Sequence, residues 1–188
     1  MPSDDYSQHP ILTAPDGADA TVFLPLLEWW RGTSIKRGRL PTRSDFRPEE
    51  LPPTCLPHIV MTEIEPDTTR IRFRLFGGAH VAFNQRDLTG RYLDEIYIGD
   101  GVLSYVMGLY RDLQSVGRPI WTVNEVRHPR SGQPLTVRRL MLPLARDGIH
   151  VDLCLAAQTF ETHSKLSPEE ANAWNATQEA GERERRYL

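Results

Sequence analysis

Proline positions divide this chain into parts that can and parts that cannot form regular structure. Five of its fifteen prolines fall within residues 36–57. Proline lacks a backbone donor and clashes with the preceding turn, so it is excluded from the interior of helices and of central strands. We therefore predict an irregular basic strap here, with a short helical turn at Pro48. Residues 1–18 mix Pro, Asp, Ser and Gly without hydrophobic periodicity, which predicts a mobile arm.

A helix is predicted just before the strap, from about Ala20 to Arg31, because apolar residues recur there at helical spacing. Gly32 is expected to end it, and with the strap it forms an N-terminal unit of residues 19–57. Its apolar side chains cover more than one narrow face, so either one side packs on the domain while the other meets a second subunit, or all of them pack within the chain. The candidate dimer interface consists of Phe23, Leu26, Leu27, Trp29 and Trp30.

Residues 58–160 alternate between β-rich runs and helical patterns, and they define the core of the fold. The predicted strands are His58–Glu65, Arg70–Phe76, Pro119–His128, Leu135–Leu144 and Ile149–Phe160, and the predicted helices are Ala79–Gln85, Tyr92–Tyr97 and Gly101–Val116. Turn residues join strands into hairpins, most clearly at Asp147-Gly148. Hairpins at both ends of the core imply an α+β fold, in which a five-stranded antiparallel sheet carries helices on one face.

A last helix is predicted over residues 167–186. Ser167-Pro168-Glu169-Glu170 has the pattern of a capping box with proline at the first helical position. The helix has few apolar residues, so we expect it to project from the domain or to pack on a partner. The core is thus expected to carry an N-terminal and a C-terminal flanking helix.

Composition narrows the class of function. The 188 residues carry 22 basic and 25 acidic side chains, a net charge of −3, whereas nucleic-acid-binding proteins usually have a basic excess. No apolar run reaches the roughly 18 residues of a membrane helix, and the acidic N-terminus is unlike a secretory signal. Cys55 and Cys154 are far apart and form no disulfide framework. We therefore expect a cytoplasmic protein that contacts neither nucleic acid nor membrane.

The order of the predicted elements resembles that of the PAS fold, a sensor domain for small molecules and signals. Residues 83–93, Phe-Asn-Gln-Arg-Asp-Leu-Thr-Gly-Arg-Tyr-Leu, are similar to the short-helix and L-x-G-R segment of many PAS domains. More specifically, the chain resembles a family of stand-alone PAS-like proteins of bacteria, mostly alphaproteobacteria. That resemblance rests on Trp29-Trp30, the strap sequence of residues 41–51, Arg-Phe-Arg-Leu-Phe-Gly at 72–77, Asp-Leu-Thr-Gly-Arg-Tyr-Leu at 87–93 and Leu-Pro-Leu-Ala-Arg-Asp-Gly at 142–148.

The resemblance covers residues 22–160 and implies the fold more than the function, because the family has no general biochemical assignment. The first hypothesis is a regulatory sensor or binding module that is not an enzyme. Such a module would act in trans, through an unknown signalling protein or through rearrangement of a homodimer. The two flanking helices would be its output surfaces.

A PAS sheet and its helices enclose a pocket, and ligand sites are mostly apolar with a few polar anchors. The candidate lining residues are Phe73, Leu75, Phe83, Leu88, Tyr92, Leu93, Val106, Tyr110, Trp121, Val123, Leu140 and Leu142. Alternatively, these side chains fill the core and leave no cavity. Arg74 and Arg138 fall on predicted strands, and an arginine inside a pocket would hold a carboxylate or phosphate. The predicted ligand is a small anionic or apolar molecule, unless both arginines face solvent or pair with nearby acids.

No cofactor is predicted. Haem needs an axial ligand such as histidine; the resemblance would place it on the helix of residues 101–116, which has no histidine, and His58 and His80 are unsupported candidates. A flavin photosensor of the light-oxygen-voltage type needs the cysteine of an N-C-R-F motif. The corresponding region reads Asn-Gln-Arg-Asp-Leu-Thr at 84–89, which excludes a flavin adduct.

The second hypothesis is a small enzyme on a curved-sheet α+β fold, in which a His/Asp pair transfers protons. The candidate pairs are His80 with Asp87 and His150 with Asp152. The second pair could also ligate a metal from one strand face, but no third ligand is visible. Curved-sheet folds of this kind usually place long helices before most strands, so the three helices between the strands favour the PAS-like hypothesis.

Overall fold

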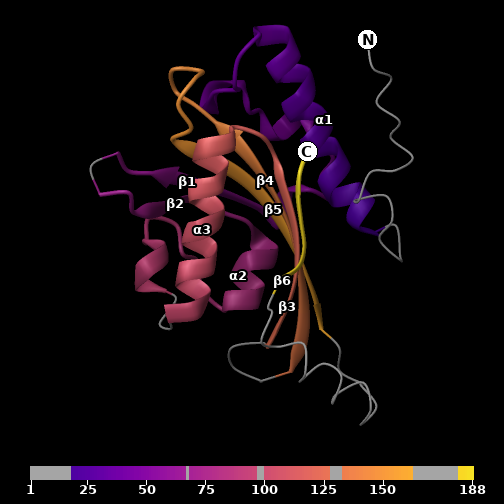
Figure 1. Ribbon diagram of the computed structural model, residues 1–188. Helices are drawn as coiled ribbons and strands as arrows, with labels where there is room; N and C mark the ends of the chain where they lie inside the picture. The colour runs from indigo at the N-terminus through magenta and orange to yellow at the C-terminus, as the bar shows by residue number, and fades with distance from the viewer. Residues whose placement is uncertain (1–17, 67, 97–99, 128–132, 163–181) are drawn as a thin grey trace.

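One antiparallel sheet organises the structure, a computed structural model that describes residues 18–66, 68–96, 100–127, 133–162 and 182–188 (Figure 1). Its six strands lie in the order β2-β1-β5-β4-β3-β6. The strands are β1 (Ile59–Ile64), β2 (Ile71–Phe76), β3 (Ile120–Arg127), β4 (Pro134–Leu144), β5 (Leu153–Thr162) and β6 (Glu182–Tyr187). The helices are α1 (Ala18–Arg37), α2 (Gly78–Asn84) and α3 (Asp100–Val116), with short 3-10 turns at Arg43–Asp45, Pro48–Glu50, Leu56–His58 and Leu93–Glu95.

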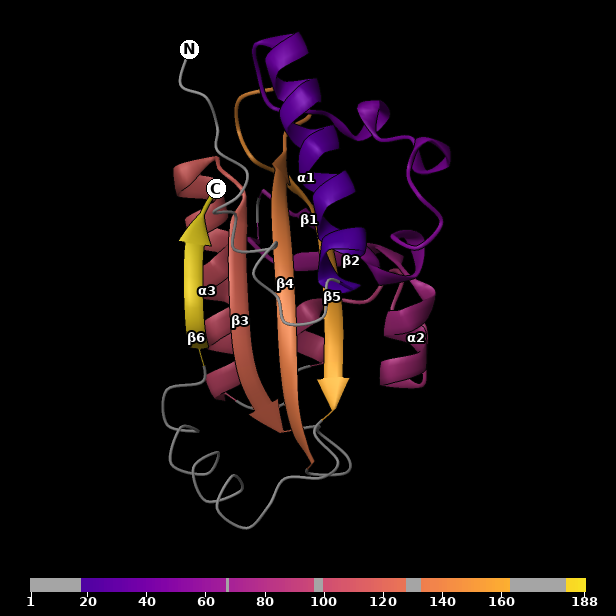
Figure 2. The same ribbon diagram turned by 90° about the vertical axis from the view of Figure 1, so that its right-hand side faces the viewer.

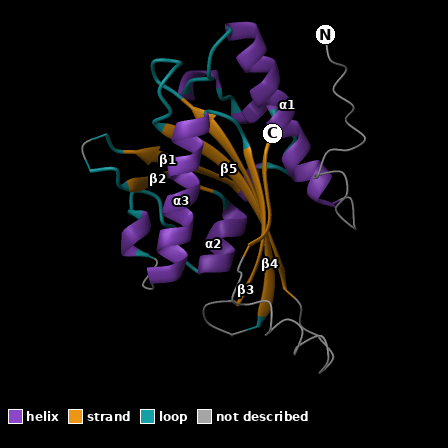
Figure 3. Cartoon of the chain, in the orientation of Figure 1, coloured by secondary structure: helices purple, strands orange, loops and turns teal. Residues whose placement is uncertain are grey.

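Helices cover both faces of the sheet. We call the face under α2 and α3 the inner face, and the face crossed by α1 the outer face (Figures 1 and 3). The first five strands, with α2 and α3 inserted between β2 and β3, have the predicted PAS-like α+β arrangement. The additions to it are α1 and β6. Among the described residues, no helix combines the length and apolar character that crossing a bilayer requires.

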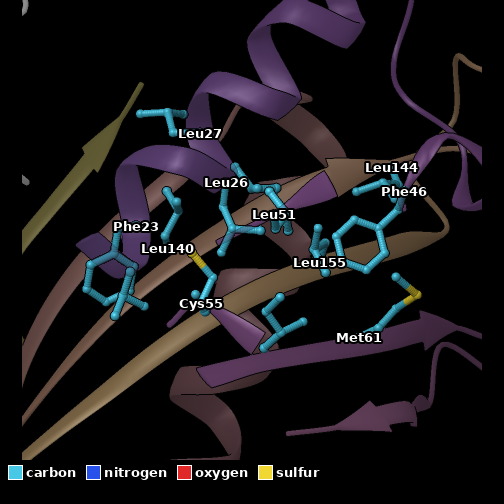
Figure 4. Close-up of a cluster of buried hydrophobic side chains, with 14 of the residues drawn as sticks. Phe23, Leu26, Leu27, Phe46, Leu51, Cys55, Met61, Leu140, Leu144 and Leu155 are labelled. Atoms are coloured by element: carbon cyan, nitrogen blue, oxygen red, sulfur yellow. The ribbon is translucent and has the colours of Figure 1, made fainter. Parts of the chain in front are cut away.

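The outer core forms where α1 packs against the sheet (Figure 4). Phe23, Leu26 and Leu27 are at most 2% exposed, and they contact buried side chains of β4 and β5 such as Leu140. The ring of Phe23 meets Trp121 of β3 edge-on, with 4.9 Å between centroids. Burial of this helix face is the main force that holds α1 on the sheet.

The predicted dimer interface is wrong for Phe23, Leu26 and Leu27. Their side chains are already buried within the chain and cannot meet a second subunit. The two tryptophans are half-buried and also make contacts inside the chain. Trp29 packs edge-on against Phe46 of the strap, with 5.3 Å between centroids. Trp30 donates from Nε1 to the carbonyl oxygen of Pro143 at 2.7 Å. A homodimer therefore stays a prediction that would need another surface.

A glycine ends α1, but it is Gly38 rather than Gly32. Gly38 has a φ of +66°, a left-handed conformation that is unfavourable for residues with a Cβ. Its N–H donates to the carbonyl oxygen of Ser34 at 2.8 Å. Gly32 and Pro25 both lie inside the helix, so neither residue interrupts it.

One carboxylate holds the beginning of the strap to the end of α1. Asp45 accepts hydrogen bonds from the Thr42 backbone at 2.7 Å, from the Thr42 hydroxyl at 2.8 Å and from Arg37 Nε at 2.8 Å. Burial raises the pKa of Asp45, but these hydrogen bonds outweigh it and the pKa is lowered on balance. The strap sequence thus has a structural role, and the predicted turn at Pro48 is present.

The inner core lies between the sheet and α3. Val106, Leu109, Tyr110 and Leu113 recur at helical spacing and are all buried. The hydroxyl of Tyr110 bonds that of Thr62 on β1 at 2.9 Å, so the one polar group of this stripe is satisfied. The bounds of α3 differ from the predicted ones by a single residue at its beginning.

A β-bulge changes the direction of side chains in β2. Met61 pairs with Leu75 and the next residue, Thr62, pairs with Phe73, which leaves Arg74 as an extra residue. Phe73 therefore lies in the inner core, whereas Leu75 packs against the outer core. Regular strand alternation predicts that these two residues share one face, and the bulge is the reason that they do not.

The connection between β4 and β5 is a loop of residues 145–152 rather than the predicted two-residue hairpin, because the strands pair only up to Leu144 and Leu153. Asp147 accepts hydrogen bonds from the backbone of Ile149 and His150 at 2.8 Å each. The loop also joins the strap, since Leu40 donates to the carbonyl oxygen of Gly148 at 3.1 Å. His150 and Asp152 are thus loop residues.

The end of the chain is a strand where a helix is predicted. Residues 182–187 form β6, which pairs antiparallel with β3 and closes that edge of the sheet (Figure 2). Arg185 Nη1 and Tyr187 Oη both donate to Asp112 of α3. The free edge of β3 supplies backbone partners that override the local helical preference. The remaining part of the predicted helix, residues 163–181, and the predicted arm up to residue 17 lie outside the described residues.

Replacing Asp112 should loosen β6 without unfolding the domain. In Asp112→Asn the acceptor loses its charge, and for such a half-exposed pair we expect a loss of about 1 kcal/mol, or about fivefold faster amide exchange in β6. Hydrogen exchange by mass spectrometry measures this directly. The control is Arg186→Gln, which removes an exposed outer-face pair with Glu184. Equal protection of β6 in Asp112→Asn and wild type would contradict the role of Asp112.

Candidate functional site

The structure separates the predicted pocket residues into two layers. Phe73, Val106 and Tyr110 belong to the inner core, together with Leu88 and Leu93. Trp121, Leu140 and Leu142 belong to the outer core, where Leu75 and Val123 also pack. No single pocket therefore includes them all, because the sheet lies between the two groups.

Arg74 does not point into the interior. Its side chain is 49% exposed and its Nε lies 3.5 Å from Glu63 of β1. Since the bulge places Arg74 outside the regular alternation of β2, the residue lies at the sheet surface. The prediction that it anchors a ligand is wrong on these grounds.

Tyr92 belongs to a surface cluster at the β1–β2 hairpin. Its hydroxyl donates to Glu65 at 2.6 Å, and the guanidinium of Arg70 lies 3.7 Å from its ring centroid. Arg70 in turn donates to both oxygens of Asp94 at 2.9 and 2.8 Å. The cluster holds the segment after α2 against the hairpin, which is a structural role.

Two adjacent arginines of β4 point to opposite faces of the sheet. Arg138 lies on the outer side, where its Nη1 donates to Glu161 at 2.6 Å. Arg139 lies on the inner side, because residues two apart in a strand share a face and Met141 belongs to the inner core. The predicted anchor Arg138 is therefore already paired with an acid, and its neighbour occupies the interior position.

Three polar side chains form a row across the inner face of β3, β4 and β5. Thr122 lies opposite Arg139, and Arg139 lies opposite Gln158. With the Gln158 amide oriented to satisfy its neighbours, its oxygen accepts from Arg139 Nε and, at 2.9 Å, from Nη2. Arg139 Nη1 and Thr122 Oγ1 are buried atoms, and neither has a hydrogen-bond partner among the described residues. We call Thr122, Arg139 and Gln158 the polar row.

His80 of α2 lies close to this row. It is 1% exposed, and its Nε2 bonds the carbonyl oxygen of His58 at 2.9 Å. Burial lowers the pKa of His80 to about 4, and the positive charge of Arg139 contributes to that shift. His80 is therefore neutral at physiological pH, and only the guanidinium is charged here.

Aromatic rings border the polar row on the β5 side. Phe83 of α2 stacks on Phe160 of β5, with 4.0 Å between centroids and an interplanar angle of 6°. Phe160 also meets His80 edge-on at 5.3 Å. Phe83 is thus the one predicted pocket residue that lies beside the polar row.

Sequence reasoning missed the polar row because residues 140–144 of β4 are buried on both faces. A run of apolar residues has no alternation that would show which arginine points inward. The available signal was the pairing of β4 with β3 on one side and with β5 on the other. A correct register places Thr122, Arg139 and Gln158 side by side.

The two His/Asp pairs of the enzyme hypothesis do not form a catalytic dyad. His80 is bonded to His58, while Asp87 accepts from the backbone and hydroxyl of Thr89 at 2.8 and 2.7 Å. His150 bonds Asp147 at 2.6 Å rather than Asp152, and its side chain is 84% exposed. Asp152 instead pairs with Arg146. Neither histidine has the predicted partner.

Thiol and metal chemistry find no support among the described residues. Cys55 and Cys154 are both buried. Burial raises the pKa of Cys55, and it raises that of Cys154 to about 12, so neither thiol is a ready nucleophile. Within the described ranges, no three His, Cys, Asp or Glu side chains gather as metal ligands.

Two hollows lie away from the polar row. One, of about 500 Å³, opens between α1 and the strap beside Trp29, Lys36 and Arg47. The other, of about 210 Å³, lies between the β1–β2 hairpin and α3 beside Leu93 and Met107. Leu93 is the predicted pocket residue that borders one of them.

Comparison with known proteins gives distant structural neighbours only. No protein-family model and no curated protein matches the sequence. The LOV protein of Rhodobacter sphaeroides shares 14% identity over 62% of this chain and 64% of its own, with a TM-score of 0.42. A variant of that protein, RsLOV, shares 18% over 64% and 69%, with a TM-score of 0.43. The light-state LOV structure of the blue-light photoreceptor aureochrome 1 shares 13% identity over 66% of this chain and 92% of its own, with a TM-score of 0.37.

The chain spans 64% of the length of the Rhodobacter sphaeroides protein, which is just under two thirds. At such values the likeness carries no argument of its own, and the PAS-like architecture stands on the order and pairing of the strands.

Proposed function

We propose that this protein is a regulatory PAS-like module that binds a small molecule between the inner face of its sheet and the α2–α3 layer. The observation that carries the proposal is the polar row. Buried polar atoms in folded proteins are almost always hydrogen-bonded. Two unpartnered atoms on adjacent strands, Arg139 Nη1 and Thr122 Oγ1, favour a binding role over a purely structural one.

Two elements outside the five-stranded core support action on a protein partner. β6 pairs with β3 through backbone hydrogen bonds and contacts α3 through Asp112. α1 covers the outer face. Both elements are additions to the five-stranded core, and a partner could read a change in either. The signalling partner is thus proposed to meet this chain at α1 or β6.

An enzyme is the weaker candidate, because its proposed His/Asp pairs bond other groups. We also do not extend the photochemistry of light-oxygen-voltage domains to this chain. Its thiols are buried, and Cys154, the one on the inner face, has a raised pKa. Attack on a cofactor needs an accessible thiolate.

The proposal is tested by native mass spectrometry and by a melting screen of the purified protein. We expect either a co-purified small molecule or a rise in melting temperature with at least one compound from a library of neutral, cationic and anionic metabolites. The control is Phe83→Ala, which opens the aromatic border of the polar row and should weaken the response. A library without any effect on wild type would leave a module for protein partners only, contrary to the proposal.

A further inference from the structure

The guanidinium of Arg139 is only partly buried: its Nη1 is shielded from solvent, while the residue as a whole keeps some exposure. The other arginines near this part of the sheet are paired: Arg138 with Glu161, and Arg185 with Asp112. No carboxylate among the described residues pairs with Arg139, whose one hydrogen-bond partner is the neutral amide of Gln158. A positive charge that is partly shielded from solvent and has no counter-ion favours the binding of an anion. The polar row therefore offers a place for one negative charge.

The geometry of the row fixes where that charge would bind. Gln158 accepts from Nε and Nη2 and so holds the plane of the guanidinium, which leaves Nη1 as the free donor. Thr122 lies directly opposite Arg139 on β3, and side chains in such cross-strand pairs have Cβ atoms about 5 Å apart. Nη1 and the Thr122 hydroxyl can therefore donate to the two oxygens of one planar anion.

The surroundings fix the rest of the ligand. Along the strands on the inner face, the row is bordered by Met141 and Ala156 on one side and by Val137 and Phe160 on the other. Phe83 stacks on Phe160. Since His80 is neutral and Arg185 is paired, the row has a single net positive charge. One positive charge balances a monoanion with an apolar body. It would leave one of the two negative charges of a phosphate dianion uncompensated.

We propose that the polar row binds the carboxylate of a small organic acid with an apolar or aromatic body. Arg139 and Thr122 are the direct donors, and Gln158 positions the guanidinium. The inference rests on the proposed function, since it names the ligand class of the same site.

The first test is the stability of two methionine variants on adjacent positions of β4. Arg139→Met removes a partly buried charge that no acid of the described residues compensates, so its melting temperature without added ligand should rise by about 3 °C. Arg138→Met breaks the pair with Glu161 on the outer face and should be unchanged or less stable. A drop in Arg139→Met as large as that in Arg138→Met would overturn the inference, because Arg139 would then be compensated in the free protein.

The second test uses benzoate and hexanoate as probes, with benzamide and sulfate as matched controls, in calorimetry and melting experiments. Wild type and Arg138→Met should bind at least one of the two carboxylates, whereas Arg139→Met should lose that binding. Valine has the same shape as threonine but lacks the hydroxyl, so Thr122→Val should bind the carboxylate about tenfold more weakly. Thr122→Val retains the charge of Arg139 and the strand pairing. It therefore still tests the inference if Arg139→Met fails to fold.

The outcomes separate this inference from the proposed function. If benzamide stabilises the protein as much as benzoate, or if Arg139→Met keeps full binding, the site exists but does not recognise a carboxylate. If neither carboxylate binds while a neutral or cationic compound does, the inference fails and the proposed function stands. If no compound of any charge binds, both fail.

Discussion

Gly77→Ala is expected to destabilise the protein by about 3 kcal/mol, because there is no room for a side chain at this position. A Cβ on Gly77 would lie 2.7 Å from the carbonyl oxygen of Ile59 and would also overlap that of Pro57. Both obstacles are backbone atoms that a rotamer change does not relieve. The N–H of Gly77 also donates to Ile59 at 2.9 Å, so a shift of the backbone would break this bond. The cause is the close approach and not the φ of Gly77, which is −68°.

The adjacent glycine provides the control. Gly78 begins α2, and a Cβ there would meet nothing within 4 Å. Gly78→Ala should therefore be neutral or stabilising by up to about 1 kcal/mol, since alanine favours a helix. Urea unfolding of the two variants decides the matter. Similar free energies of unfolding for both would show that the packing of α2 against residues 57–59 is not as tight as described.

Lowering the pH from about 7.5 to about 4.5 is expected to remove about 2.5 kcal/mol of the free energy of unfolding through His80 alone. The pKa of His80 falls from an ordinary 6.5 to about 4 in the folded protein, mainly because the ring is buried. The unfolded chain therefore binds a proton at a higher pH than the folded chain does. The contribution of His80 is fully present above pH 6.5 and is lost as the pH falls toward 4.

The comparison that isolates this effect is between wild type and His80→Gln. Glutamine can still donate to the carbonyl oxygen of His58, but it does not titrate. Acid-labile ion pairs elsewhere act equally on both proteins, so the wild type should lose more stability than the variant between the two pH values. Parallel pH profiles of the urea midpoint would refute the depressed pKa. An NMR titration of the His80 ring gives an independent measurement.

The sequence predicted most of the core correctly where the local pattern and the tertiary environment agree. α3 has an apolar stripe that matches its buried face, and α2 begins one residue before its predicted start at Ala79. The strands β1 to β4 begin and end within one or two residues of their predicted bounds. In α3 the helical periodicity selects the residues that are buried, so local pattern and packing give the same answer.

The errors occur where a distant segment decides the local structure. Residues 182–187, Glu-Arg-Glu-Arg-Arg-Tyr, have the composition of an exposed helix, yet the open edge of β3 and the carboxylate of Asp112 make them a strand. Residues 149–152 have a strand-like alternation, yet Asp147 and the strap hold them in a loop. Hydrogen bonds to other segments outweigh local preference in both cases.

The sequence by itself determined the order of the elements in the five-stranded core, and with it the PAS-like α+β fold, because turn residues and hydrophobic periodicity are local signals. The tertiary structure decided which side chains face the interior. The extra residue at Arg74 places Leu75 in the outer core. On β4, Arg138 points to the outer face and the next residue, Arg139, points to the inner face. The side-chain period of a strand is two, so a difference of a single residue inverts the face. Only strand pairing fixes that register, and it placed Thr122, Arg139 and Gln158 in one row.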